Sequence, residues 1–133
     1  MSEPVVLDTS AILAVINGEP GQDAVIPTLL DAVVCAVNLA EVVGVLAVRG
    51  MPADRAYRAA TALGFTVIPL DDRRACAAGA MRTLTRSLGL SLGDRCCLAL
   101  GQQRAATVFT TDSAWSHLPA ELGIRIRNIR RAD

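Results

Sequence analysis

Short runs of apolar, strand-forming residues alternate along this chain with longer segments of helical periodicity. The first run, Val5-Val6-Leu7, is apolar in succession rather than in alternation, which suits a strand that is covered on both faces, as in parallel sheets. The predicted strands are residues 5–7, 32–35, 65–68, 107–110 and 124–129. This alternation predicts a three-layer α/β/α fold with a mainly parallel central sheet of about five strands.

Helix start and stop signals separate these strands. Asn17-Gly18, Gly50, Gly64 and Gly89 are stop signals, and Ser91 is a cap for the helix that follows it. The predicted helices are residues 11–16, about 25–30, 38–49, 52–64, 72–88 and 92–103. In the last strand, Ile124 and Ile126 alternate with arginines, which indicates an edge strand with one wet face.

Size, charge and cysteine content indicate how many domains the chain forms and which kinds of partner and compartment to expect. The 133 residues are 52% hydrophobic, so we expect one domain, residues 1–133, with one well-filled core. Thirteen basic residues balance thirteen acidic ones, so a nucleic-acid partner has to be inferred from a site rather than from overall charge. The four cysteines lack C-x-x-C spacing and are predicted to be buried thiols. No apolar run reaches the ~20 residues of a membrane span, and we expect a soluble, cytoplasmic protein.

Two acids stand directly after predicted strands. Asp8 follows Val5-Val6-Leu7, and Asp112 comes after Thr110 and Thr111 at the end of another strand. Open α/β sheets place their ligand sites at the carboxyl ends of the strands, which makes both acids candidate site residues. The alternative is local: Asp8, Thr9 or Ser10 caps the helix that begins at Ala11, and Asp112 forms an ordinary Asp turn.

Two further acids lie early in predicted helices. Glu41 is the one charge in the apolar segment 36–48, and Asp94 lies on the inward stripe of its helix with Cys97 and Leu98 as neighbours. Asn38 to Glu41 and Ser91 to Asp94 both have capping-box spacing, so capping is an alternative role for each acid. An acid on an apolar stripe still needs a partner when it is buried.

All four acids are expected at one rim of the sheet. Carboxylates held close together repel one another and raise each other's pKa, so such a cluster stays ionised when a cation occupies it. Ligands that are all oxygen favour a hard ion, Mg²⁺ or Mn²⁺.

The chain resembles the PIN-domain ribonucleases, in particular the VapC-type toxins of type II toxin-antitoxin modules. The matching segments, in order along nearly the whole chain, are VVLDTSA at 5–11, NLAEV at 38–42, LSLGD at 90–94, LAL at 98–100 and VFTTDSAW at 108–115. The site acids of the family correspond to Asp8, Glu41, Asp94 and Asp112, and Ser10 and Thr111 match supporting positions. Arg95 departs from the family pattern, in which a small residue follows the acid, and its guanidinium could pair with a site carboxylate.

The resemblance implies a PIN-like domain that cleaves RNA phosphodiester bonds with a divalent metal. Asp8 and Asp94 would be the principal ligands of one Mg²⁺ or Mn²⁺ ion, Asp112 would hold a second ion or a bridging water, and Glu41 would position the attacking water. It also implies a small VapB-like antitoxin as partner, and a homodimer. Two alternatives remain: a PIN-domain nuclease of RNA processing without a dedicated antitoxin, and a catalytically silent binding module whose acids cap helices.

Overall fold

The computed structural model describes residues 3–131, which form one five-stranded sheet with helices on both faces. The strands run in the order β3-β2-β1-β4-β5, and each pairs parallel to its neighbour. Their bounds are β1 Val5–Leu7, β2 Val33–Cys35, β3 Thr66–Ile68, β4 Thr107–Thr110 and β5 Arg125–Asn128. The predicted parallel sheet, including the edge strand at the end of the chain, is confirmed.

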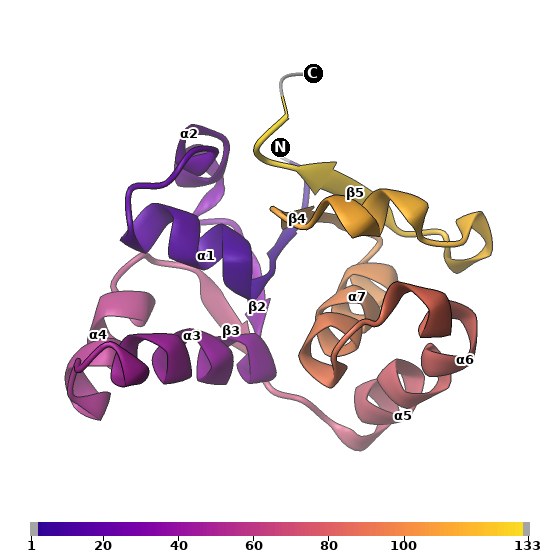
Figure 1. Cartoon of the computed structure of the whole chain (residues 1–133), viewed down its shortest axis with the longest axis horizontal. Coiled ribbons are helices and arrows are strands. Elements are labelled where there is room, and N and C mark those ends of the chain that lie inside the picture. Colours follow the sequence, from indigo (N-terminus) through magenta and orange to yellow (C-terminus); the bar gives the residue numbers. More distant parts are fainter. Residues whose placement is uncertain (1–2, 132–133) are drawn as a thin grey trace.

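The helices lie in two layers (Figure 1). The layer on one face comprises α1 Thr9–Ile16, α2 Gln22–Val25, α3 Ala36–Val48 and α4 Ala53–Thr61. The layer on the other comprises α5 Asp72–Ala80, α6 Arg82–Thr85 and α7 Leu92–Arg104. Successive residues of β1 point to opposite faces of the sheet. Val5 and Leu7 pack in the core under α1 and α3, whereas Val6 packs in the core under α7. This splitting of one strand between two cores confirms the three-layer α/β/α prediction.

The strand order reverses in the middle of the sheet. From β1 the chain first adds β2 and then β3 on one side of the sheet. It then returns to the centre, where β4 pairs with the other side of β1. In open parallel sheets such a reversal leaves a crevice at the carboxyl ends of the two central strands. Asp8 and Asp112 follow β1 and β4, the two strands that flank this crevice.

The predicted helix over residues 72–88 is wrong in one respect, because it is interrupted at Met81. α5 ends at Ala80, a four-residue helix α6 follows, and a 3-10 turn spans Arg86–Leu88. The Thr85 hydroxyl donates to the Met81 carbonyl at 2.8 Å. Such a side-chain bond back to the main chain competes with the regular helical ladder, and the chain bends here.

Two other helix boundaries also differ from the prediction. The segment predicted as a helix over residues 25–30 is split between α2 and a 3-10 turn, Ile26–Thr28, that contains Pro27. α3 begins at Ala36 rather than Asn38, with Cys35 at its N-cap, so Asn38 lies inside the first turn. The alternative in which Asn38 and Glu41 form a capping box is therefore wrong, and the Asn38 side chain makes other contacts.

The prediction that all four thiols are buried is wrong for Cys76, which is exposed on α5. Cys35, Cys96 and Cys97 are buried as expected, and all four are free.

Within residues 3–131, no helix combines the length and apolar character that crossing a membrane requires.

Candidate active site at the carboxyl edge of the sheet

Asp8 is the most deeply buried of the four candidate acids, with 5% of its surface exposed. It is the N-cap of α1, where one carboxylate oxygen accepts the Ala11 N–H at 2.8 Å and the Ser10 hydroxyl at 2.7 Å. Burial raises the pKa of Asp8 to about 6, and the charge of Asp94 adds to that rise, although bonds from Ser10, Thr110 and Ala11 oppose it. Of the three candidate caps, Asp8 is the one that caps α1, and it is also an acid whose ionised form is costly to hold at this position.

Asp94 lies in the first turn of α7, near enough to Asp8 to affect its titration. Ser91 and Asp94 form the predicted capping box, in which Asp94 Oδ2 accepts the Ser91 N–H at 2.9 Å and Ser91 Oγ accepts the Asp94 N–H at 3.1 Å. One turn later, Cys97 is fully buried. The pKa of its thiol lies well above its ordinary value because of burial and then the charges of Asp8, Asp94 and Glu41. All three carboxylates therefore lie near enough to Cys97 to act on its thiol.

Glu41 is held in a network that joins three helices. Its Oε1 accepts the Thr9 hydroxyl at 2.7 Å and Asn38 Nδ2 at 3.1 Å. Asn38 Nδ2 also approaches the Gly93 carbonyl of α7 at 3.2 Å. A Cβ on Gly93 would lie 2.5 Å from Glu41 Oε2, so the Glu41 carboxylate rests directly on the backbone beside Asp94.

Asp112 is exposed and forms the predicted Asp turn, accepting the Ala114 N–H at 2.9 Å. It is connected to Asp8 through Thr110, whose hydroxyl donates to Asp8 and accepts the Asp112 N–H at 3.0 Å. Ser10 adds a second link, because its hydroxyl donates to Asp8 and accepts the Thr111 N–H at 2.9 Å. Ser10 thus contributes a side chain to the site and Thr111 contributes its main chain.

The donor set suits a hard divalent cation in its chemistry, because all four candidate groups are carboxylates. Asp8 in particular is a buried acid whose ionised form a nearby cation would stabilise. Within residues 3–131, however, no three His, Cys, Asp or Glu side chains are grouped closely enough to hold one ion. The carboxylates of Asp94 and Asp112 are instead engaged in their caps.

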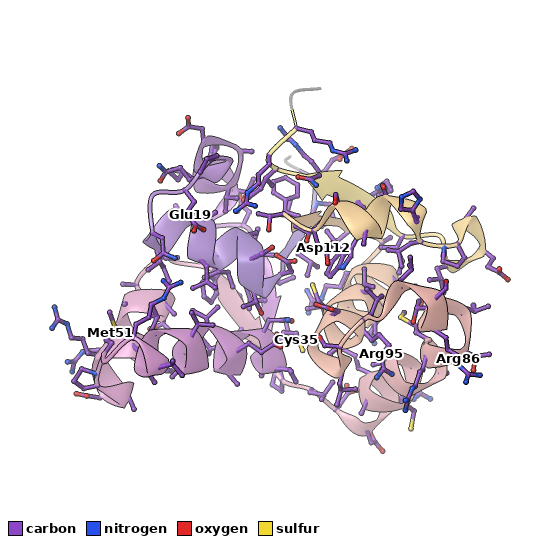
Figure 2. The ribbon with its side chains drawn as sticks, viewed as in Figure 1. Glu19, Cys35, Met51, Arg86, Arg95 and Asp112 are labelled. Carbon is purple, nitrogen blue, oxygen red and sulfur yellow. The ribbon has the colours of Figure 1, made fainter. Side chains whose placement is uncertain are left out.

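Arg95 does not face the acids. It is 9% exposed and lies between α7 and α5 (Figure 2), where its Nη1 donates to the Ala78 carbonyl at 2.9 Å. The predicted pairing of its guanidinium with a site carboxylate is therefore wrong. Residue 95 follows Asp94 on the helix, and one step of about 100° turns its side chain toward the neighbouring helix.

Thr9 and Gly93 were missed from the sequence as contributors to the site, because their contacts with Glu41 join residues 32 and 52 positions apart and no local spacing indicates them. Asn38 was considered only as a helix cap, although it lies three positions from Glu41 and donates to its carboxylate. One signal was present in the sequence, because Asn38 is a polar residue within an apolar segment, and the structure buries it to 1% exposure.

Comparisons with known proteins agree with this fold. The family model described as PIN domain matches residues 5–121. Among solved structures, DNA-bound VapBC from Salmonella typhimurium is 18% identical with a TM-score of 0.73, and the match covers 95% of this chain and 98% of that one. VapBC2 from Rickettsia felis, bound to a promoter DNA fragment, is 15% identical with a TM-score of 0.72, covering 93% and 97%. VapBC-5 from Mycobacterium tuberculosis is 22% identical with a TM-score of 0.61, covering 94% and 98%. No curated protein sequence matches the chain.

Proposed function

Because the chain belongs to the PIN domain family, we propose that it is a divalent-metal-dependent endoribonuclease, the VapC-type toxin of a toxin-antitoxin pair. The observation that carries this proposal is Asp8, a buried carboxylate at the end of a central strand, with Asp94 nearby and a pKa raised to about 6. Capping alone does not require a buried acid, because an exposed Asp caps a helix equally well. Perturbed acids in a crevice are typical of functional sites.

Asp8, Asp94 and Asp112 would hold Mg²⁺ or Mn²⁺, with Asp8 and Asp94 on one ion. When bound, a divalent ion lowers the pKa of a water and neutralises charge on the scissile phosphate. Glu41, fixed by Thr9 and Asn38, would orient the attacking water. The Ser10 hydroxyl and the Thr111 N–H would hold Asp8 and the loop of Asp112 in fixed positions relative to each other. PIN domain nucleases generally use divalent metals, which supports this assignment.

The proposed partners are RNA as substrate, a small VapB-like antitoxin as inhibitor and a second copy of the chain. Solved structures of similar fold are VapBC and toxin-antitoxin complexes, which supports the antitoxin. The surface of this chain also supports protein partners, because Leu30 is 82% exposed and Val48 90% exposed. Val48 lines a shallow groove on α3 with Glu41, Gly44, Val45 and Arg49. We place the activity in the cytoplasm and assign residues 1–133 to a single domain.

A silent binding module is the second candidate, and one observation favours it. Asp8, Asp94 and Asp112 each accept a main-chain N–H as a cap, and no three-ligand group is present among residues 3–131.

A PIN nuclease without an antitoxin differs from the toxin in its gene context. A short open reading frame directly upstream would favour the toxin, and its absence would favour the other nuclease.

Cleavage of a mixed RNA pool, tRNA included, tests the proposal. Wild type and Asp8→Asn are compared with Mg²⁺, with Mn²⁺ and with a chelator, and the variant controls for contaminating nucleases. Asparagine retains the N-cap, so we expect a folded protein whose metal-dependent cleavage is lost by orders of magnitude. Equal behaviour of the two proteins, together with no measurable metal binding by wild type, would favour the silent module.

A further inference from the structure

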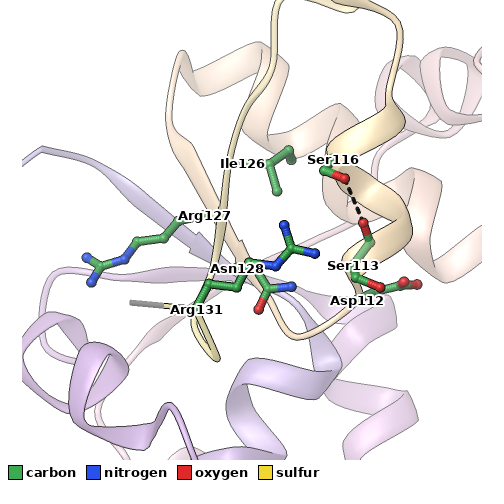
Figure 3. A pocket seen from close by; sticks show the side chains of 7 residues that line it. All are labelled: Asp112, Ser113, Ser116, Ile126, Arg127, Asn128 and Arg131. Carbon is green, nitrogen blue, oxygen red and sulfur yellow. Dashed lines mark hydrogen bonds between the residues drawn. The ribbon is translucent and has the colours of Figure 1, made fainter. Parts of the chain in front are cut away.

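A small cleft adjoins the candidate active site at Asp112. It lies between β5 and the 3-10 turn Ser113–His117 that follows Asp112 (Figure 3). Its volume is about 210 Å³. Its lining residues are Asp112, Ser113, Ser116, Ile126, Arg127, Asn128 and Arg131. Pockets for drug-sized ligands measure roughly 300–1,000 Å³, so this cleft suits a single small chemical group.

The lining offers unused hydrogen-bonding groups. The guanidinium of Arg131 points into the cleft between Asn128 and Ser113 (Figure 3), and it has no hydrogen-bond or ion-pair partner among residues 3–131. Asn128 uses its Oδ1 to accept the Arg130 N–H at 3.0 Å, which orients its amide nitrogen. The Ser116 hydroxyl donates to the Ser113 carbonyl at 2.8 Å and still has its oxygen lone pairs to accept with. The cleft therefore presents both donors and acceptors to an occupant.

The chemistry of the lining favours a neutral, flat occupant over an anion. Asp112 carries a carboxylate into the lining, which disfavours a phosphate there, and Ile126 supplies an apolar wall. The Arg127 guanidinium lies over the Phe109 ring, 5.3 Å from its centroid, and points away from the other lining side chains (Figure 3). Arginine and asparagine are the side chains that bind purine edges in pairs of hydrogen bonds, and an arginine plane also stacks on unpaired bases.

We propose that this cleft is a base-binding subsite that holds the nucleotide next to the scissile phosphate, with Arg131 and Asn128 as its specificity-determining residues. The inference rests on the proposed ribonuclease function. Asp112 belongs both to the site and to the cleft, so a base held here would lie beside the cut. RNA is commonly recognised by single unstacked bases, which fits a cleft of this size.

Two adjacent arginines give a matched test. Arg131→Gln and Arg130→Gln each remove one positive charge from exposed neighbouring positions, but Arg130 does not line the cleft. Wild type and both variants are given a random-sequence RNA pool with Mg²⁺ or Mn²⁺, and the fragment ends are sequenced. We expect Arg131→Gln to lose the base preference at one position beside the cut and to raise KM about tenfold or more, and Arg130→Gln to retain both. Asn128→Ala should alter the preference at the same position.

Distinct results separate the inference from the proposed function. A wild type that cuts no RNA would refute both. A wild type that cuts, together with an Arg131→Gln variant whose base preference matches that of Arg130→Gln, would refute the subsite and leave the ribonuclease intact. A loss of affinity that is uniform over all sequences would also overturn the base subsite, because it is the signature of a phosphate contact.

Discussion

Gly93→Ala is expected to displace Glu41 without unfolding the protein. The new Cβ would lie 2.5 Å from Glu41 Oε2 and 2.6 Å from its Cδ, about 1 Å closer than an ordinary contact. The Glu41 carboxylate is the end of a flexible side chain, so it will move by about that distance and lose its bonds with Thr9 and Asn38. A 1 Å misplacement of a catalytic group costs on the order of 100-fold in rate. We therefore expect kcat to fall about 100-fold.

Stability should change little in the same variant. Gly93 lies in the first turn of α7, so its replacement by alanine gains at most about 0.5 kcal/mol, and two lost hydrogen bonds cost about 0.5–1.5 kcal/mol each. The net loss is about 1 kcal/mol, which urea denaturation will measure beside the RNA cleavage assay. Gly44→Ala is the control, since its added Cβ meets nothing within 4 Å on α3, the helix that carries Glu41. A Gly93→Ala variant as active as Gly44→Ala would refute the role assigned to Glu41.

Three further predictions concern stability and reactivity. Without metal, Asp8→Asn should be more stable than wild type by about 3 kcal/mol at pH 8. The folded pKa of Asp8, about 6, exceeds the ordinary 3.8, so burying its charge costs stability that grows from about pH 4 to pH 6 and is complete above pH 6. This advantage should shrink as the pH falls through 6 and vanish near pH 4; an advantage independent of pH in urea titrations would contradict it. Asn38→Ala should lower the free energy of unfolding by about 1–3 kcal/mol and reduce the rate of RNA cleavage, because the buried Asn38 amide joins Thr9, Glu41 and the Gly93 carbonyl. An unchanged midpoint of urea denaturation would exclude that role. Of the four thiols, Cys76 alone should react rapidly with an aromatic disulfide reagent in the native protein, and rapid reaction of more than one thiol would contradict the burial of the others.

The sequence by itself determined the layers of this fold and the edge at which the acids gather. Apolar runs such as Val5–Leu7 and the helical segments between them are local patterns, and local patterns are enough to alternate strands with helices. Parallel strands then place residues that follow them, such as Asp8 and Asp112, at one edge. The capping roles of Asp94 and Ser91 were likewise predictable, because a capping box spans three residues.

Only the tertiary structure decided how these acids are held. Burial raises the pKa of Asp8, and burial depends on elements packed around β1 from distant parts of the chain. Asn38 proved to be a bridge from α3 to Gly93 on α7 rather than a cap, and Arg95 turned toward α5 rather than toward the acids. These contacts join residues 55 and 17 positions apart, and their partners are selected by how helices pack on the sheet, which no spacing along the chain encodes.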